Sequence, residues 1–151
     1  MRHPFTLALA AAALPASAFP AFAQTEDAKP TVTEPPAIVR FASAKTLACE
    51  GLPGCDFVLL AGDPAAGPTQ WFFRLKAGAE FPRHWHSTPE NMVMIEGALT
   101  FNVEVGEPHT LVAGEHLRHQ AGMIHWGQCE LGEDCLHYVF NDQPYDLHSA
   151  E

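Results

Sequence analysis

Short β-prone segments recur from residue 37 onward, about ten residues apart, with Gly, Pro and Asp between them. Strands spaced in this way are typical of an all-β sandwich or barrel. No window of a dozen residues shows the 3.6-residue periodicity of an amphipathic helix. The chain is therefore predicted to fold as one all-β domain, and its strands are expected at residues 38–41, 57–61, 69–76, 80–86, 91–96, 99–104, 109–112, 115–120, 124–128 and 136–140.

The first 23 residues have the form of a cleavable signal peptide. A basic start precedes the apolar run 5–13, and residues 21–23 (Ala-Phe-Ala) match the small-residue cleavage site. A membrane anchor is disfavoured because the run is shorter than the roughly 20 residues of a bilayer span and is followed by Pro15 and Pro20. We expect cleavage after Ala23 and a periplasmic or secreted protein that has no membrane segment afterwards.

The rest of the chain divides into a leader and a domain. Residues 24–36 are rich in Pro and charge and lack hydrophobic periodicity, so they predict a flexible leader before a domain at residues 37–151. The formal net charge is −10, with no basic stripe. Nucleic acid and anionic membrane surfaces are therefore not expected as partners.

Four cysteines form two local pairs, each with five residues between its members. Cys49 and Cys55 flank one turn-rich stretch, and Cys129 and Cys135 flank the other. In an oxidising compartment this arrangement favours two disulfides, each within a hairpin. A link between the two hairpins stays possible, and a four-thiolate metal site is disfavoured by a spacing wider than that of structural zinc pairs.

The histidines carry the clearest chemical signal. Five residues separate Gly78 from His84, and one separates His84 from His86. Three residues then precede Glu90, and six more precede Gly97. Two histidines at i and i+2 of a strand point to the same face, and a short turn can bring the carboxylate of Glu90 to the same point. Imidazole and carboxylate ligands together suit Zn, Fe, Mn, Ni or Cu.

This spacing resembles the first sequence motif of the cupin superfamily. A partial second motif follows, with Gly114, Gly122 and His125 in place, whereas Gln120 and Cys129 stand where the family has proline and asparagine. Those two family residues shape turns, so their replacement puts the local loop geometry in question and leaves the ligand set intact.

The resemblance implies a cupin double-stranded β-helix, a small jelly-roll barrel. It also implies one divalent transition metal ion held by His84, His86, Glu90 and His125, with iron favoured and Zn, Mn, Ni or Cu as alternatives. A degenerate cupin that has lost its metal is the competing interpretation. It is disfavoured because all four positions carry ligand-type side chains.

Five residues near these positions have simpler expected roles. Met92 and Met94 share the face of Glu90 by strand alternation, and they either line the pocket or pack in the core. Arg83 is expected at the surface, and Trp85 and Trp126 are expected to pack behind the ligands.

The remaining histidines are assigned less firmly. By the same resemblance, the predicted catalytic residues are Glu90, because a glutamate is assigned proton transfer in some cupin dioxygenases, and His137, because the last strand often lines the pocket in cupins. Tyr138 reaches the pocket only if His137 does not. Any of His116, His119 and His137 is a candidate for a general base or for a hydrogen-bond partner of a metal ligand. Surface positions are expected for His109 and His148.

The predicted function is that of a metal-dependent enzyme acting on a small organic molecule. A dioxygenase-like reaction is favoured, and isomerase or lyase chemistry is the alternative with a redox-inert ion. A non-catalytic module that binds a metal or a small ligand is the competing class, because fold does not fix function. A homodimer is possible, with residues 37–44 supplying an intersubunit strand.

Overall fold

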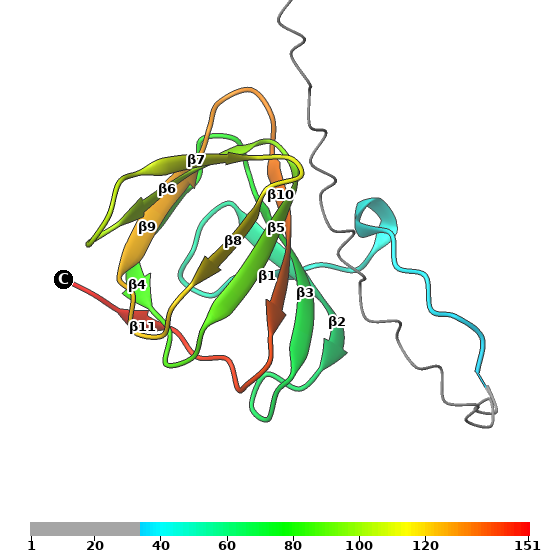
Figure 1. Ribbon diagram of the computed structural model, residues 1–151. Coiled ribbons are helices and arrows are strands. Elements are labelled where there is room, and N and C mark those ends of the chain that lie inside the picture. Colours follow the sequence, from blue (N-terminus) through cyan, green and yellow to red (C-terminus); the bar gives the residue numbers. More distant parts are fainter. Residues whose placement is uncertain (1–33) are drawn as a thin grey trace, which may run out of the picture. The chain divides into compact units, whose positions relative to one another are not determined.

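Alternating apolar and polar residues build two antiparallel sheets, as the sequence predicts (Figure 1). The computed structural model describes residues 34–151, and its strands lie within a compact unit of residues Ala37–Glu151. The predicted signal peptide and most of the predicted leader lie outside the described residues. Within the described part, no helix is long and apolar enough to span a membrane.

Six strands form one sheet and five form the other. The order in the first sheet is β1 (Leu47–Ala48), β2 (Cys55–Gly62), β3 (Thr69–Leu75), β10 (Cys135–Asn141), β5 (Glu90–Glu96) and β8 (His116–His119). The order in the second sheet is β11 (His148–Ser149), β4 (Glu80–Trp85), β9 (His125–Cys129), β6 (Ala98–Val103) and β7 (His109–Val112). This is the jelly-roll architecture expected from the sequence.

Strand β10 shows how the inner faces of the sheets make the core. Its residues alternate strictly between buried and half-buried, and the buried set is Cys135, His137, Val139 and Asn141. These inward residues share the core with side chains of the opposite sheet, among them Leu99, Phe101 and Leu111. The same alternation turns His137 inward and Tyr138 outward.

Both predicted disulfides form, but only the first lies within a hairpin, because β9 and β10 belong to different sheets. Cys49–Cys55 closes the turn between β1 and β2, and Cys129–Cys135 closes the turn between β9 and β10. These four cysteines form neither a link between the two pairs nor a thiolate metal site.

The last glycine of the first motif has a clear structural cause. Gly97 forms the turn between β5 and β6 with a φ of +78°, a conformation that other residues rarely adopt. A Cβ at this position would lie 2.7 Å from the carbonyl oxygen of Asp134 and 2.9 Å from the Cα of Cys135. The turn therefore requires glycine.

The expected strand at residues 38–41 is wrong. This segment is extended without pairing and continues into a 3-10 helix, η1 (Phe41–Ser43). The Phe41 ring packs edge-on against Phe72 with a centroid separation of 6.3 Å, and Arg74 lies over its face. The place beside β2 is taken by β1, which the sequence analysis missed, as it missed β11, because each has only two residues.

Candidate metal centre

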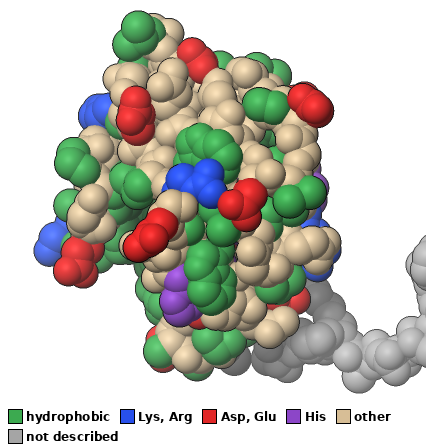
Figure 2. All heavy atoms as spheres, turned by 90° about the vertical axis from the view of Figure 1, so that its left-hand side faces the viewer, with side chains coloured by type: hydrophobic (Ala, Val, Ile, Leu, Met, Phe, Trp, Pro, Cys, Tyr) green, Lys and Arg blue, Asp and Glu red, His purple; other side chains and the backbone are tan. Residues whose placement is uncertain are grey.

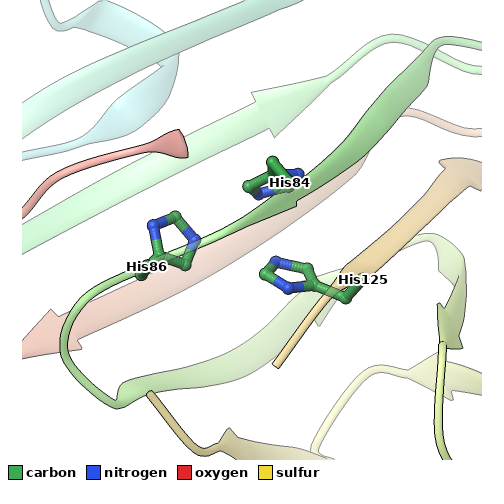
Figure 3. A group of neighbouring side chains, drawn as sticks. All are labelled: His84, His86 and His125. Carbon is green, nitrogen blue, oxygen red and sulfur yellow. The ribbon is translucent and has the colours of Figure 1, made fainter. Parts of the chain in front are cut away.

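Three histidines from two neighbouring strands converge inside the barrel. His84 is near the end of β4, His86 directly follows that strand, and His125 is the first residue of β9. His84 and His125 are paired across the β4–β9 ladder, and their ring centroids lie 4.1 Å apart. All three are buried, and Figure 3 shows their rings turned toward a common space. One potential ligand atom from each lies within 4.8 Å of the others.

Hydrogen bonds to the backbone orient all three rings. Nδ1 of His84 lies 2.7 Å from the Pro82 carbonyl oxygen, and Nδ1 of His125 lies 2.9 Å from that of Met123. For His86 the corresponding contact is 2.5 Å, to the carbonyl oxygen of Asp146. A carbonyl only accepts, so each Nδ1 carries the proton and each Nε2 keeps a free lone pair, the form that ligates a metal.

Glu90 belongs to a second group, with His86 and His119. It is the first residue of β5, and its side chain is 12% exposed. Its Oε2 lies 3.9 Å from Nε2 of His86, and its Oε1 lies 3.4 Å from Nε2 of His119. Suitable ligand atoms of these three residues also lie within 4.8 Å of one another. His86 is common to both groups, so the carboxylate and the histidine cluster form one polar centre.

Burial sets the charge of this centre. Desolvation lowers the pKa of His84, and it lowers that of His125 to about 3, where the nearby imidazoles add to the effect. For Glu90, burial would raise the pKa, but the neighbouring His119 and His86 outweigh this effect and lower the value to about 2. Neutral imidazoles beside an ionised carboxylate are the protonation states that a metal site requires.

The centre lies at one end of a pocket of about 530 Å³. His84, His86, Glu90 and His125 contribute to its lining. The remaining lining is mostly apolar, and its aromatic members are Phe57, Trp71, Phe73, Phe81, Phe101 and Tyr145. Among the described residues, no Lys or Arg lines this pocket. The pocket has the size and apolar character of a small-molecule site.

His137 also lines the pocket, as predicted, and Tyr138 does not. The ring of His137 stacks on Phe73 with an interplanar angle of 10° and a centroid separation of 5.8 Å. Within the described part of the chain its Nδ1 has no hydrogen-bond partner. Burial lowers the pKa of His137 to about 4, so a neutral imidazole faces the pocket at pH 7.

Tyr145 was missed by the sequence analysis. Its ring lies 5.1 Å from that of His86 and 5.8 Å from that of Trp71, so it covers the pocket beside the polar centre. Its backbone N–H donates to the Pro64 carbonyl, and burial raises the pKa of its hydroxyl. Tyr145 lies in the irregular segment after β10, where no periodic pattern signals an inward side chain.

The neighbours of the ligand positions lie largely where expected. Arg83 points away from the centre, pairs with Glu104 at 2.9 Å and covers the Trp126 ring. Trp85 stacks on His148 with ring centroids 4.1 Å apart, so His148 is partly covered. The face in Figure 2 accordingly shows acidic side chains beside the basic ones and no extended basic patch.

Both methionines are buried, and they divide between the two expected roles. Met92 lines the pocket, whereas Met94 is 1% exposed and belongs to the core. His109 and His116 are exposed, in contrast to His119, which is 1% exposed. The sequence analysis ranked His119 below His137, yet it faces Glu90 across the β5–β8 ladder, a pairing that motif spacing does not reveal.

The donor set fits a divalent transition metal. Three imidazoles with free Nε2 atoms and an adjacent carboxylate are ligands suited to Zn, Fe, Mn, Ni and Cu. The structure thus brings together all four residues predicted as ligands, and their role in binding an ion stays a prediction.

Comparison with solved structures finds cupin folds. The polyketide cyclase RemF from Streptomyces resistomycificus superposes with a TM-score of 0.67 at 16% identity, over 76% of this chain and 85% of that one. A cupin sugar phosphate isomerase from Silicibacter pomeroyi superposes with a TM-score of 0.62 at 18% identity, over 76% of this chain and 82% of that one. A third match is the anti-sigma factor ChrR of Rhodobacter sphaeroides, solved in complex with SigE. Its TM-score is 0.55 at 20% identity, over 68% of this chain and 51% of that one. At these identities the likeness shows the fold alone.

Comparison by sequence places the chain in a family. No curated protein sequence matches significantly. A family model described as the ChrR cupin-like domain matches residues 35–144, which include both sequence motifs and all four predicted ligands. The chain therefore belongs to the ChrR cupin-like domain family of the cupin superfamily.

Proposed function

We propose that the chain is an exported, metal-dependent enzyme that acts on a small organic molecule with an apolar body. The observation that carries this proposal is the convergence of three oriented imidazoles and a carboxylate at one end of a pocket of about 530 Å³. A structural metal site needs no such space beside it, whereas a reactive site needs room for a substrate.

His84, His86, His125 and Glu90 hold one divalent transition metal in this proposal. Iron is the favoured ion, and when bound it supplies redox chemistry with molecular oxygen, so a dioxygenase-like reaction leads. With Zn, Mn, Ni or Cu the same residues support isomerase or lyase chemistry. Glu90 has a second proposed role, because its carboxylate is the acidic group of the centre that can transfer a proton to or from a substrate.

The pocket walls define the substrate. They are largely apolar and include six aromatic side chains, so they favour flat apolar groups, and the described lining contains no cation that would bind a phosphate. Glu50 and Glu90, the acidic members of the lining, add repulsion toward anions. We therefore expect an uncharged, aromatic or otherwise apolar compound rather than a sugar phosphate.

His137 is the proposed polar contact for the substrate within the apolar wall. Its ring is held by stacking on Phe73, and its Nδ1 has no partner in the described part of the chain. A substrate hydroxyl or carbonyl in the pocket would satisfy a ring nitrogen and thereby orient the reacting atoms.

Oxygen uptake tests this function. Iron-loaded protein is incubated with small phenols and diols and, as a contrast, with sugar phosphates. We expect substrate-dependent oxygen consumption with the aromatic compounds, and none in the His84→Ala/His86→Ala double variant. Stoichiometric binding of a phenol to the loaded protein, with no turnover and no oxygen uptake, would contradict the enzymatic proposal.

The second candidate is a binding or sensing module. Membership of the ChrR cupin-like family and the fold shared with the anti-sigma factor ChrR, of which this chain covers 51%, favour this class. In that case ligand binding without turnover, or binding of another protein, is the function. The oxygen-uptake experiment separates the two classes.

Export and dimerisation stay predictions. The two disulfides support an oxidising compartment, and mass spectrometry of the exported protein should find an N-terminus at Gln24. Residues 37–40 are extended and unpaired in the single chain, so their use as an intersubunit strand stays a prediction. Size-exclusion chromatography with light scattering tests for a dimer.

A further inference from the structure

His119 faces Glu90 directly across two antiparallel strands. The two residues are Cα partners in the β5–β8 ladder, which places both side chains on the inner face. The two carboxylate oxygens face different histidines. Oε2 lies 3.9 Å from Nε2 of His86, and Oε1 lies 3.4 Å from Nε2 of His119.

The protonation pattern separates His119 from the three predicted histidine ligands. In those residues Nδ1 lies 2.5 to 2.9 Å from a backbone carbonyl, which fixes the proton there. Nδ1 of His119 lies 3.5 Å from the Gln120 carbonyl, at the limit of a hydrogen bond. This carbonyl therefore does not fix the tautomer, so Nε2 of His119 is free to carry a proton and donate it.

The position of His119 also differs from that of a ligand in an open site. It is 1% exposed and is not part of the pocket lining, whereas Glu90 and the three predicted histidine ligands are. Its Nε2 is buried and has no hydrogen-bond partner within the described residues, and the Glu90 carboxylate is the acceptor it faces. His119 thus lies behind Glu90 as seen from the pocket.

We propose that His119 is a positioning residue that donates from Nε2–H to Oε1 of Glu90 and thereby turns Oε2 toward the three histidines. This role rests on the proposed metal centre. This hydrogen bond holds the carboxylate in one orientation, as partners of metal ligands do in other sites. Removing such a partner typically lowers metal affinity about 10- to 100-fold.

Metal affinity measured by chelator competition with Zn²⁺ tests this role. We expect His119→Ala to weaken binding about 10- to 100-fold. His119→Gln should recover much of the loss, since its amide N–H reaches the position of Nε2. His119→Asn should not, because its shorter side chain places the amide near Nδ1. His116→Ala removes an exposed imidazole from the same strand and should leave the affinity unchanged.

A second measurement separates positioning from ligation. X-ray absorption on the zinc-loaded protein should count three imidazoles in the wild type and three in His119→Gln. Four in the wild type and three in the variant would make His119 a ligand and overturn the proposal, and so would equal affinities of wild type and His119→Ala. Unfolding of the metal-free variants in guanidinium excludes a general loss of structure as the cause.

The two proposals fail in different ways. If the wild type binds zinc but the His119 variants bind it equally well, the metal centre stands and the positioning role is wrong. If the folded wild type binds no zinc, the metal centre is wrong, and the role of His119 is wrong with it.

Discussion

The polar end and the apolar wall of the pocket are built in different ways. The polar end consists of a few residues at strand ends, His84, His86, Glu90 and His125, each held by a specific hydrogen bond or cross-strand pair. The apolar wall consists of aromatic side chains from β2, β3, β4 and β6, packed at centroid distances of 5.4 to 6.2 Å. We therefore expect the wall to contribute most to folding and the polar end to carry the proposed chemistry.

Replacing an aromatic residue of the wall by alanine is the most severe test of whether the wall supports the fold. Trp71 is 5% exposed and packs against Phe57 and Phe73, so Trp71→Ala should lower the free energy of unfolding by about 3 to 5 kcal/mol. Guanidinium unfolding of the metal-free protein measures the change. Val105→Ala, at a position 84% exposed, is the control and should change stability by less than about 0.5 kcal/mol. A similar small loss for Trp71→Ala would show that the wall does not support the fold.

Removing a histidine of the polar end should weaken metal binding and leave the fold intact. His125→Ala removes one predicted ligand and should weaken zinc binding by at least about 100-fold, equivalent to about 2.7 kcal/mol, more than the loss of a residue that only supports a ligand. The metal-free variant should still unfold cooperatively. His109→Ala, an exposed imidazole on β7, should retain wild-type affinity. Unchanged affinity in His125→Ala would remove this residue from the site.

Mild acid should lower the stability of the metal-free protein, because two of its buried histidines have low pKa values in the native state. His125 and His137 have native pKa values of about 3 and about 4, below the unfolded value near 6.5, so unfolding takes up protons. Their contribution to stability is complete above pH 6.5 and is lost as the pH falls toward the native values. Between pH 6 and pH 5 the free energy of unfolding of the metal-free protein should fall by about 2 kcal/mol.

Unfolding curves at both pH values measure this loss. The double variant His125→Gln/His137→Gln should show most of it abolished. Glu90 does not interfere in this range, because its native pKa is about 2. A wild-type stability that is constant from pH 6 to pH 5 would contradict buried neutral histidines at these positions.

The smallest expected effect concerns His137, the proposed polar contact for the substrate. His137→Phe removes a buried Nδ1 that lacks a partner in the described part of the chain, and it should stabilise the metal-free protein by about 1 kcal/mol while lowering turnover. Thermal unfolding and oxygen uptake measure the two effects. Loss of stability together with unchanged turnover would assign His137 to packing alone.

The sequence specifies the polar end more fully than the wall, for physical reasons. On a strand, the i, i+2 spacing of His84 and His86 places both side chains on the same face. Gly97 is required because a Cβ there would contact Asp134 and Cys135. The nine expected strands from residue 57 onward all form, because strand alternation and turn residues are local signals.

The parts that the sequence did not reveal depend on long-range contacts. Tyr145 reaches the pocket through an irregular segment held by Pro64, which lies 81 residues earlier in the chain. His119 gains its importance from its place opposite Glu90, and the register of β5 against β8 sets that place. The segment 38–41 has strand-like residues, but the place beside β2 is taken by β1.

Metal content of the exported protein tests the central claim most directly. Wild type, the His84→Ala/His86→Ala double variant and His116→Ala are purified without chelators and measured by inductively coupled plasma mass spectrometry. The account predicts about one transition metal ion per chain in the wild type and in His116→Ala, and none in the double variant. A folded wild type without a transition metal, or equal metal in the double variant, would contradict it.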